Sequence, residues 1–273
     1  MRRASWVALI AILIGCENSP SPAGEQAHDH PPSAQRIACL SPALSSTLCE
    51  LGWKDRIVGR TPWCEGLEGV PVVGSLLEVN LENLSAVHPD LILVQRSSAG
   101  LPPALAAAAA SRHWCVAQIS CTSLRDVQAL EPTLISMVGE VPPHAVAQSR
   151  WSAALAPCAA AAARSPCMLL FAADPPQAFG SNSYLAQVWK AWGGSTLPDV
   201  AGDPTLRLED VFLASPRSVL LIGGGEGAEV LSKACADRGV AFELISDGGL
   251  LRPGPQLLAS VERWRASCTG DVP

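Results

Sequence analysis

Side chains that could hold a ligand gather just after short apolar runs of this sequence. Each run predicts a buried strand, and in open α/β sheets ligands bind outside the carboxyl ends of the strands. The side chains placed at three such ends are Ser41, Trp63, Cys64, Gln95 and Arg96. They predict a binding site along the edge of a sheet. The competing interpretation is ordinary loop chemistry, with Trp63 partly buried in its loop.

Catalytic motifs are missing from the sequence. There is no G-x-S-x-G elbow, no H-E-x-x-H pair and no Ser/His/Asp context, and Asp174 and His88 each lie beside a proline in a predicted turn. The glycines Gly223–Gly225 lack the spacing of a dinucleotide fingerprint and the lysine of a P-loop. We therefore expect a protein that is not an enzyme and that has no cofactor. A hydrolase or other enzyme on an α/β scaffold is the more distant alternative.

Charge and cysteine spacing exclude two further classes. The formal net charge is −6, whereas nucleic-acid binding needs a basic face. No C-x-x-C pair or clustered Cys/His spacing is present, so no metal site is expected. Ten cysteines in an exported protein suggest disulfides instead. Conceivable pairs are Cys39 with Cys49, Cys115 with Cys121, and Cys235 with Cys268, and the sequence leaves the connectivity open.

The start of the chain has the pattern of a signal peptide. Arg2 and Arg3 precede the apolar run Trp6–Ile14, which is short for a membrane span. Leu13–Cys16 resembles a bacterial lipobox, and this resemblance implies cleavage before Cys16 and a lipid on its sulfur. A plain secretory signal or an uncleaved anchor is the alternative. The segment 17–35 is rich in Pro, Ser and Ala and predicts a flexible tether.

Strands and helices alternate along the remainder of the chain. Hydrophobic residues make up 48% of the 273 residues, enough for one large or two modest domains. We predict an α/β fold of two Rossmann-like lobes, each with a central sheet. The expected divisions are a signal peptide 1–16, a tether 17–35, a first lobe 36–139, a connecting helix 140–165 and a second lobe 166–273.

The connection between the lobes is predicted to be one long helix over Pro142–Arg164. Prolines open it and alanine dominates it. Its 23 residues would reach roughly 35 Å. Pro157 opposes continuity, since it removes a backbone hydrogen bond and kinks or splits a helix. An ordinary surface helix within a single domain is the alternative.

Five short pieces follow one another in the first half. They are Arg36–Pro42, Leu51-Gly52, Arg56–Glu65, Val73–Glu82 and His88–Leu93. In this order and spacing they resemble the periplasmic substrate-binding proteins of vitamin B12 and iron-siderophore ABC importers. The Trp-Cys-Glu loop is most similar to the Tyr-Cys-Asp loop of the B12-type members. The similarity covers roughly residues 36–268 and is firmer in the first half.

This resemblance implies a ligand held between two lobes. Trp63 falls on the family's aromatic position. Leu76 and Gln95 fall on positions where some B12 binders carry Trp, and Thr205 lies near another such position. We expect Phe171 and Phe179 to supply ring faces in their place, and Arg96 to meet a carboxylate or a phosphate. Aromatic and apolar faces suit a flat corrin or a bulky metal chelate. Cobalamin or a related corrinoid is the expected ligand, with an iron siderophore or haem as the alternative. For haem, Tyr184 is the single tyrosine, and His88 and His113 are poorly placed.

The resemblance also implies partners and a location. Glu82 and Glu209 match the paired acidic residues, one in each lobe, that meet arginines of the permease in this family. The alternative is that both are first-turn glutamates favoured by the helix dipole. We therefore expect a monomeric lipoprotein in the periplasm, anchored to a membrane through Cys16.

Overall fold

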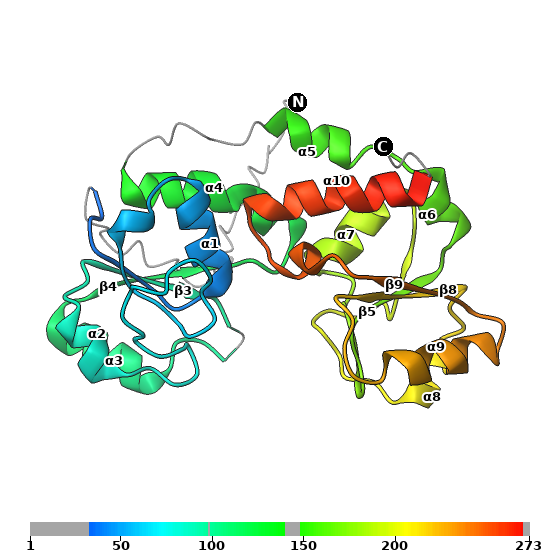
Figure 1. Cartoon of the computed structure of the whole chain (residues 1–273), viewed down its shortest axis with the longest axis horizontal. Helices are drawn as coiled ribbons and strands as arrows, with labels where there is room; N and C mark the ends of the chain where they lie inside the picture. The colour runs from blue at the N-terminus through cyan, green and yellow to red at the C-terminus, as the bar shows by residue number, and fades with distance from the viewer. Residues whose placement is uncertain (1–32, 98, 140–147, 270–273) are drawn as a thin grey trace, which may run out of the picture.

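Two α/β lobes make up the structure, a computed structural model that describes residues 33–97, 99–139 and 148–269. The lobes lie side by side (Figure 1). This confirms the predicted fold class. The signal peptide 1–16 with Cys16, and the tether as far as residue 32, lie outside the described residues.

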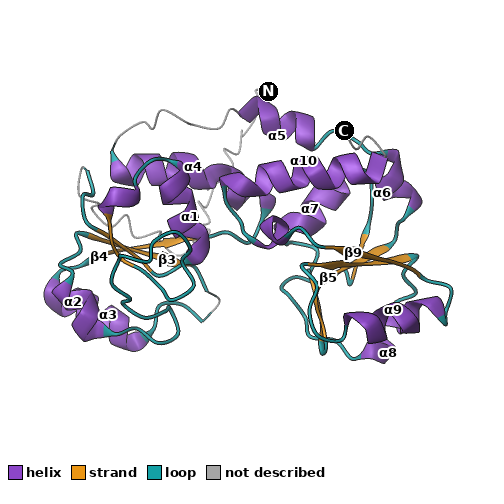
Figure 2. Ribbon diagram, viewed as in Figure 1, coloured by secondary structure: helices purple, strands orange, loops and turns teal. Residues whose placement is uncertain are grey.

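The first lobe contains a parallel sheet with the strand order β2-β1-β3-β4. Its strands are β1 (Ile37–Cys39), β2 (Ile57–Gly59), β3 (Leu91–Gln95) and β4 (Cys115–Ile119). The helices α1 (Pro42–Glu50) and α4 (Leu124–Val138) cover one face, and α2 (Leu81–Ala86) and α3 (Pro103–Arg112) cover the other (Figure 2). The short helix η1 (Lys54–Arg56) precedes β2. Because both faces are covered, β3 is a continuous apolar run rather than an alternating one.

The second lobe repeats this plan with additions at its edge. Its sheet order is β6-β5-β8-β9, with β7 also paired to β5, and only β6 is antiparallel. The strands are β5 (Cys167–Ala173), β6 (Pro176–Ala178), β7 (Thr196–Leu197), β8 (Ser218–Ile222) and β9 (Ala241–Ile245). The helices α7 (Tyr184–Ala191) and α10 (Pro255–Thr269) lie on one face, and α8 (Leu208–Leu213) and α9 (Ala228–Ala236) lie on the other (Figure 2). Sequence reasoning missed β6 and β7, which are too short to show a period.

Local sequence signals set the starts of several helices. Ser41 accepts a hydrogen bond from the N–H of Leu44, and Asn80 accepts one from Asn83. Ser123 and Asp126 form a reciprocal capping box at the start of α4. Such caps satisfy N–H groups that the first turn of a helix leaves without an internal partner.

The prediction of one continuous helix over Pro142–Arg164 is wrong in the part that the structure describes. Two helices, α5 (Gln148–Ala154) and α6 (Ala159–Ala163), are separated at Pro157. Cys158 donates its N–H to the carbonyl of Trp192 at 2.9 Å rather than within a helix. Arg265 donates to the carbonyls of Ala156 and Pro157 at 3.3 Å. Tertiary hydrogen bonds at the proline therefore outweigh the helix propensity of the alanines. Residues 142–147 of the predicted helix lie outside the described residues.

Packed helices join the lobes instead. α10 runs along the top of the second lobe in Figure 1 with its start beside the first lobe, and Gln256 at that start donates to Ser46 of α1 at 3.0 Å. A side chain at Gly254 would meet the hydroxyl of Thr47 at 2.9 Å, so the backbone approaches α1 closely there. Leu124 at the start of α4 belongs to the apolar cluster of the second lobe. The two lobes therefore share a core as well as a boundary.

The predicted disulfides are absent, because all nine cysteines of the described residues are free thiols. Cys115 opens β4 and Cys121 lies two residues past its end, and at about 3.3 Å per residue the strand alone separates its own ends by roughly 13 Å, too far for a disulfide. Cys235 lies in the apolar cluster on one face of the second sheet, and Cys268 packs against the cluster on the other face. The thiol of Cys39 lies in the core and donates to the carbonyl of Ser41.

Two features are absent from the described residues. No helix there is both long enough and apolar enough to cross a bilayer. No group of three His, Cys, Asp or Glu side chains in that part of the chain could hold a metal ion.

Candidate functional site

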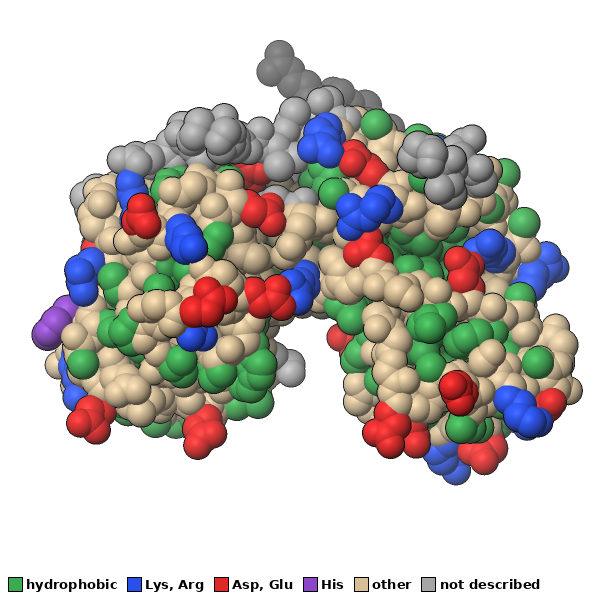
Figure 3. Space-filling view, viewed as in Figure 1, with side chains coloured by type: hydrophobic (Ala, Val, Ile, Leu, Met, Phe, Trp, Pro, Cys, Tyr) green, Lys and Arg blue, Asp and Glu red, His purple; other side chains and the backbone are tan. Residues whose placement is uncertain are grey.

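A pocket lies between the two lobes at the carboxyl ends of their sheets. It has a cavity volume of about 270 Å³. Side chains of both lobes line it: Gln95, Cys121 and Thr122 from the first, and Phe171, Phe179, Ser183, Tyr184, Asp203, Leu251 and Pro253 from the second. The space-filling view shows the molecule hollowed between the lobes, on the side away from α10 (Figure 3).

The first-lobe side of the pocket is built from two neighbouring strands. β1 and β3 pair directly, so Ser41 and Gln95 leave the sheet at the same edge. The Ser41 hydroxyl donates to the side-chain oxygen Oε1 of Gln95 at 3.2 Å, while Ser41 also caps α1. Gln95 is therefore oriented by a buried hydroxyl, and its amide nitrogen remains a donor toward the pocket.

Aromatic rings form the wall of the second lobe. The ring centroids of Phe171 and Phe179 are 5.0 Å apart, and those of Phe179 and Tyr184 are 6.2 Å apart in an edge-on arrangement. The hydroxyl of Tyr184 donates to the carbonyl of Leu250 at 2.9 Å. Burial raises the pKa of Tyr184 well above its usual value. This hydroxyl is therefore a neutral, occupied donor, and the wall presents ring faces and edges to a ligand.

An ion pair crosses the opening from one lobe to the other. Arg252 of the second lobe donates to both carboxylate oxygens of Glu65, which belongs to the Trp-Cys-Glu loop of the first lobe. The hydrogen bonds from Arg252 hold the pKa of Glu65 below its usual value. Leu251 and Pro253, on either side of Arg252, line the pocket itself. The loop predicted from sequence to meet the ligand thus reaches the rim of the pocket through Glu65.

Trp63 lies at a separate depression of the first lobe. It is 65% exposed, and the depression has a volume of about 480 Å³. Its other lining residues are Pro62, Val72, Gly74, Ser75, Glu78, Val79, Asn80 and Asn83. Trp63 does not line the inter-lobe pocket. Because Trp63 and Glu65 are two residues apart in one loop, a large ligand could touch both hollows.

The other predicted site residues are distributed as follows. Gln95, Phe171 and Phe179 line the pocket, and Ser41 supports Gln95. Cys64, Leu76, Arg96 and Thr205 do not line it. Cys64 is buried with its sulfur 3.2 Å from the Thr61 hydroxyl, and Leu76 packs on the first-lobe core. Arg96 and Thr205 are exposed, and Thr205 pairs with Gln177.

Sequence reasoning missed part of the lining in both lobes. In the first lobe, Cys121 and Thr122 lie two and three residues past the end of β4, so the carboxyl-end rule applied to that strand would have found them. Asp203, Leu251 and Pro253 come from loops with no local signal. They reach the pocket only because η2 (Gly248–Leu251) and the loop after β7 fold over the carboxyl edge of the second sheet.

Glu82 and Glu209 occupy matching positions in the two lobes. Each lies in the first turn of a short helix, α2 or α8, and is exposed. Figure 1 places these helices on the same lower side of the two lobes. Neither glutamate has an ion-pair partner among the described residues, and Arg207 beside Glu209 pairs with Asp210 instead. Both carboxylates are therefore available to a partner.

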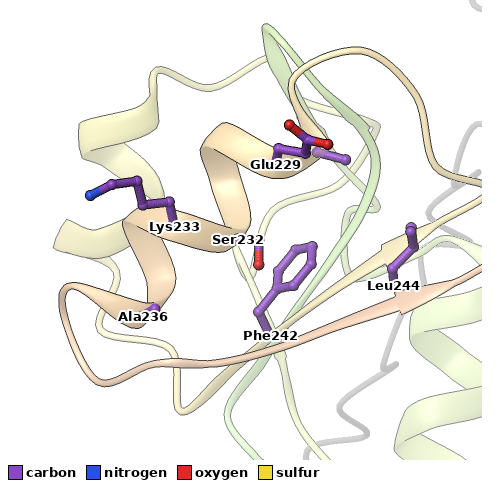
Figure 4. Close-up of a pocket in the computed structure, with 7 residues that line it drawn as sticks. Glu229, Ser232, Lys233, Ala236, Phe242 and Leu244 are labelled. Atoms are coloured by element: carbon purple, nitrogen blue, oxygen red, sulfur yellow. The ribbon is translucent and has the colours of Figure 1, made fainter.

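A third hollow lies on the outside of the second lobe, between α9 and β9 (Figure 4). Its volume is about 410 Å³, and Glu229, Lys233, Phe242 and Leu244 are among its lining residues. It contains no residue of the first lobe. It shares no lining residue with the inter-lobe pocket.

No family model matches the sequence, and no curated protein matches it. Solved structures do. The periplasmic vitamin B12 binding protein BtuF of Vibrio cholerae aligns with a TM-score of 0.64 and 18% identity, over 87% of this chain and 97% of that one. A periplasmic haem-binding protein of Pseudomonas aeruginosa gives 0.66 and 19%, over 88% and 94%.

The molybdate periplasmic binding protein MolA of Haemophilus influenzae gives a TM-score of 0.67 and 18% identity, over 89% of this chain and 90% of that one. At these identities the likeness establishes the fold. The chain has the two-lobed fold of the periplasmic binding proteins, as the resemblance in its first half predicted.

Proposed function

We propose that this protein is the substrate-binding component of an ABC importer and binds a bulky metal chelate between its lobes. The observation that carries the proposal is the inter-lobe pocket, with Gln95 on one side and the Phe171, Phe179 and Tyr184 rings on the other. A pocket that combines aromatic faces with a few polar groups is typical of small-molecule binding. The protein holds its ligand without transforming it.

The ligand that we propose is cobalamin or a related corrinoid. A corrin is flat and largely apolar, and the ring wall and the exposed indole of Trp63 supply two faces for it. The inter-lobe pocket alone, at about 270 Å³, is small for a whole corrinoid. Our proposal therefore places the ligand across both the pocket and the Trp63 depression.

Haem or an iron siderophore is the second candidate. Structures of haem-binding proteins are among those that align with this chain. The hydrogen bond of the Tyr184 hydroxyl favours a corrinoid over haem. Tyr184 could coordinate a haem iron only if its hydroxyl gave up the hydrogen bond to the carbonyl of Leu250.

Delivery to the membrane is part of the proposal. Glu82 and Glu209 would meet cationic groups of two permease subunits, since rim charges set register and encounter rate. Lipid on Cys16 would hold the monomer at a membrane in the periplasm.

Calorimetry tests the proposed function. The purified chain is titrated with cobalamin, haem and a panel of ferric siderophores. We expect a dissociation constant of about 1 μM or lower for cobalamin. Phe171→Ala, which removes one ring of the wall, is the matched variant and should weaken that binding. Binding of a siderophore or haem alone would select the second candidate, and turnover of a substrate without binding of any chelate would refute the proposal.

A further inference from the structure

Arg252 lies between two residues that line the pocket, Leu251 and Pro253. Its Nη1 and Nη2 donate to the Glu65 carboxylate at 2.8 and 2.5 Å. Two parallel hydrogen bonds of this kind are the geometry in which arginine binds a planar anion. The side chain already holds one carboxylate, and that carboxylate comes from the opposite lobe.

The backbone around Arg252 is fixed, while the ion pair itself is open to solvent. Arg252 donates its N–H to the carbonyl of Gly249, and the carbonyl of Leu250, two residues before Arg252, accepts a hydrogen bond from the Tyr184 hydroxyl. Pro253 is buried. In contrast, the side chains of Arg252 and Glu65 are 48% and 71% exposed. The guanidinium is thus positioned by the fold, but its partner can be exchanged at little cost, because exposed ion pairs contribute little to stability.

The charges around the pocket determine which kind of ligand group could replace Glu65 at Arg252. Asp203 is the one carboxylate among the lining residues, and the lining contains no cation. Without Glu65, Arg252 would present a positive charge at the rim of a pocket walled by aromatic rings. A ligand group that binds there must therefore be an anion.

We propose that Arg252 binds an anionic group of the ligand, a carboxylate or a phosphate, and that Glu65 occupies the guanidinium until the ligand arrives. This inference rests on the proposed binding function and adds a charge requirement to it. Glu65 acts as an internal competitor, so it selects for ligands whose anion binds Arg252 better than a side-chain carboxylate does.

Matched ligands test the charge requirement. Cobyric acid carries one free carboxylate that is amidated in cobinamide, and haem carries two that are blocked in its dimethyl ester. We expect Glu65→Gln to tighten binding of the acids by about two- to fivefold, since it removes an exposed competitor. Arg252→Gln should weaken their binding about tenfold or more, because a hydrogen bond to a charged group is lost. The amidated and esterified ligands should change little in either variant. Equal effects on acids and blocked ligands would overturn the inference.

A second measurement does not need a bulky ligand. In the full ¹⁵N-labelled chain, the Nε resonance of Arg252 is identified by its loss in Arg252→Gln and is followed while inorganic phosphate or citrate is added. We expect a shift at lower anion concentration in Glu65→Gln than in the unmodified protein, with Arg217 as an exposed reference. No response to either anion in Glu65→Gln would refute the anion site even if cobalamin binds. A response without binding of any chelate would keep the anion site and refute the proposed corrinoid function instead.

Discussion

The hydroxyl of Tyr184 donates a 2.9 Å hydrogen bond to the carbonyl of Leu250, and the backbone N–H of the same tyrosine donates to Thr122 of the other lobe at 2.8 Å. Tyr184 therefore ties α7 both to the first lobe and to the segment that carries Leu251 and Pro253 into the pocket. One residue sets the relative position of three parts of the pocket wall.

Replacing Tyr184 by Phe tests this role. The ring would stay, but the Leu250 carbonyl would lose its buried donor. We expect the free energy of unfolding to fall by about 1–2 kcal/mol, measured by urea denaturation. Phe179→Tyr, which adds a hydroxyl to the neighbouring ring without removing this bond, separates loss of the bond from disturbance of the wall. Unchanged stability in Tyr184→Phe would show that the bond contributes nothing.

The indoles of the second-lobe core offer a matched pair of substitutions. Trp192 donates its Nε1–H to the carbonyl of Ala154 at 2.8 Å, whereas Nε1 of the equally buried Trp264 has no partner. The centroids of the two rings are 4.8 Å apart, and the rings pack edge to face. We expect Trp192→Phe to cost about 1 kcal/mol more than Trp264→Phe, because only the first leaves a buried carbonyl unpaired. Chemical denaturation of both variants measures the difference, and the reverse order would contradict this account.

Two substitutions test whether the ligand contacts both the inter-lobe pocket and the Trp63 depression. Trp63 is mostly exposed, so Trp63→Ala should change stability by about 0.5 kcal/mol or less. If cobalamin spans both hollows, its affinity should nevertheless fall about tenfold, as it should in Phe171→Ala. Calorimetry measures the cobalamin affinity of both variants. A fall in Phe171→Ala alone would confine the ligand to the inter-lobe pocket.

Docking through the two lobes is tested by Glu82→Ala combined with Glu209→Ala. We expect cobalamin binding in solution to persist and uptake into cells to fall at least about tenfold, because rim charges set docking. Glu229→Ala is the matched control, since Glu229 is also a first-turn glutamate, in α9. If the control lowers uptake equally, or if the double variant loses ligand binding, the docking role is wrong.

Buried thiols predict a pH dependence of stability. Burial raises the pKa of Cys121 and of Cys167 from 9.0 to about 12. Unfolding exposes these thiols, which then ionise near 9, so the unfolded state loses protons first as the pH rises. Their stabilising contribution is complete below pH 9 and is lost between about 9 and 12. Urea denaturation of reduced protein at pH 7.5 to 10.5 should follow this trend, and Cys121→Ala should flatten it. A curve that does not depend on pH would contradict it.

The sequence by itself determined most of the elements and their order. Ser41, Asn80 and Ser123 cap the starts of their helices, and such signals are local because a cap satisfies N–H groups only a few residues away. The continuous apolar run of β3 marks a strand covered on both faces. The position of Gln95 at the pocket could be predicted, because the end of a strand can be recognised in the sequence. These signals are local, so they need no knowledge of what packs where.

Only the tertiary structure decided how the lobes are joined and which side chains meet. Alanine propensity favoured one long helix, but the contacts of Cys158 and Pro157 with distant residues split it. Cys115 and Cys121 are six positions apart in the sequence, yet the extended strand β4 lies between them and keeps them from pairing. Glu65 meets Arg252 across 187 positions of the chain. The free energy of such contacts depends on partners that folding brings together. The residues adjacent in the sequence do not indicate which residues those partners are.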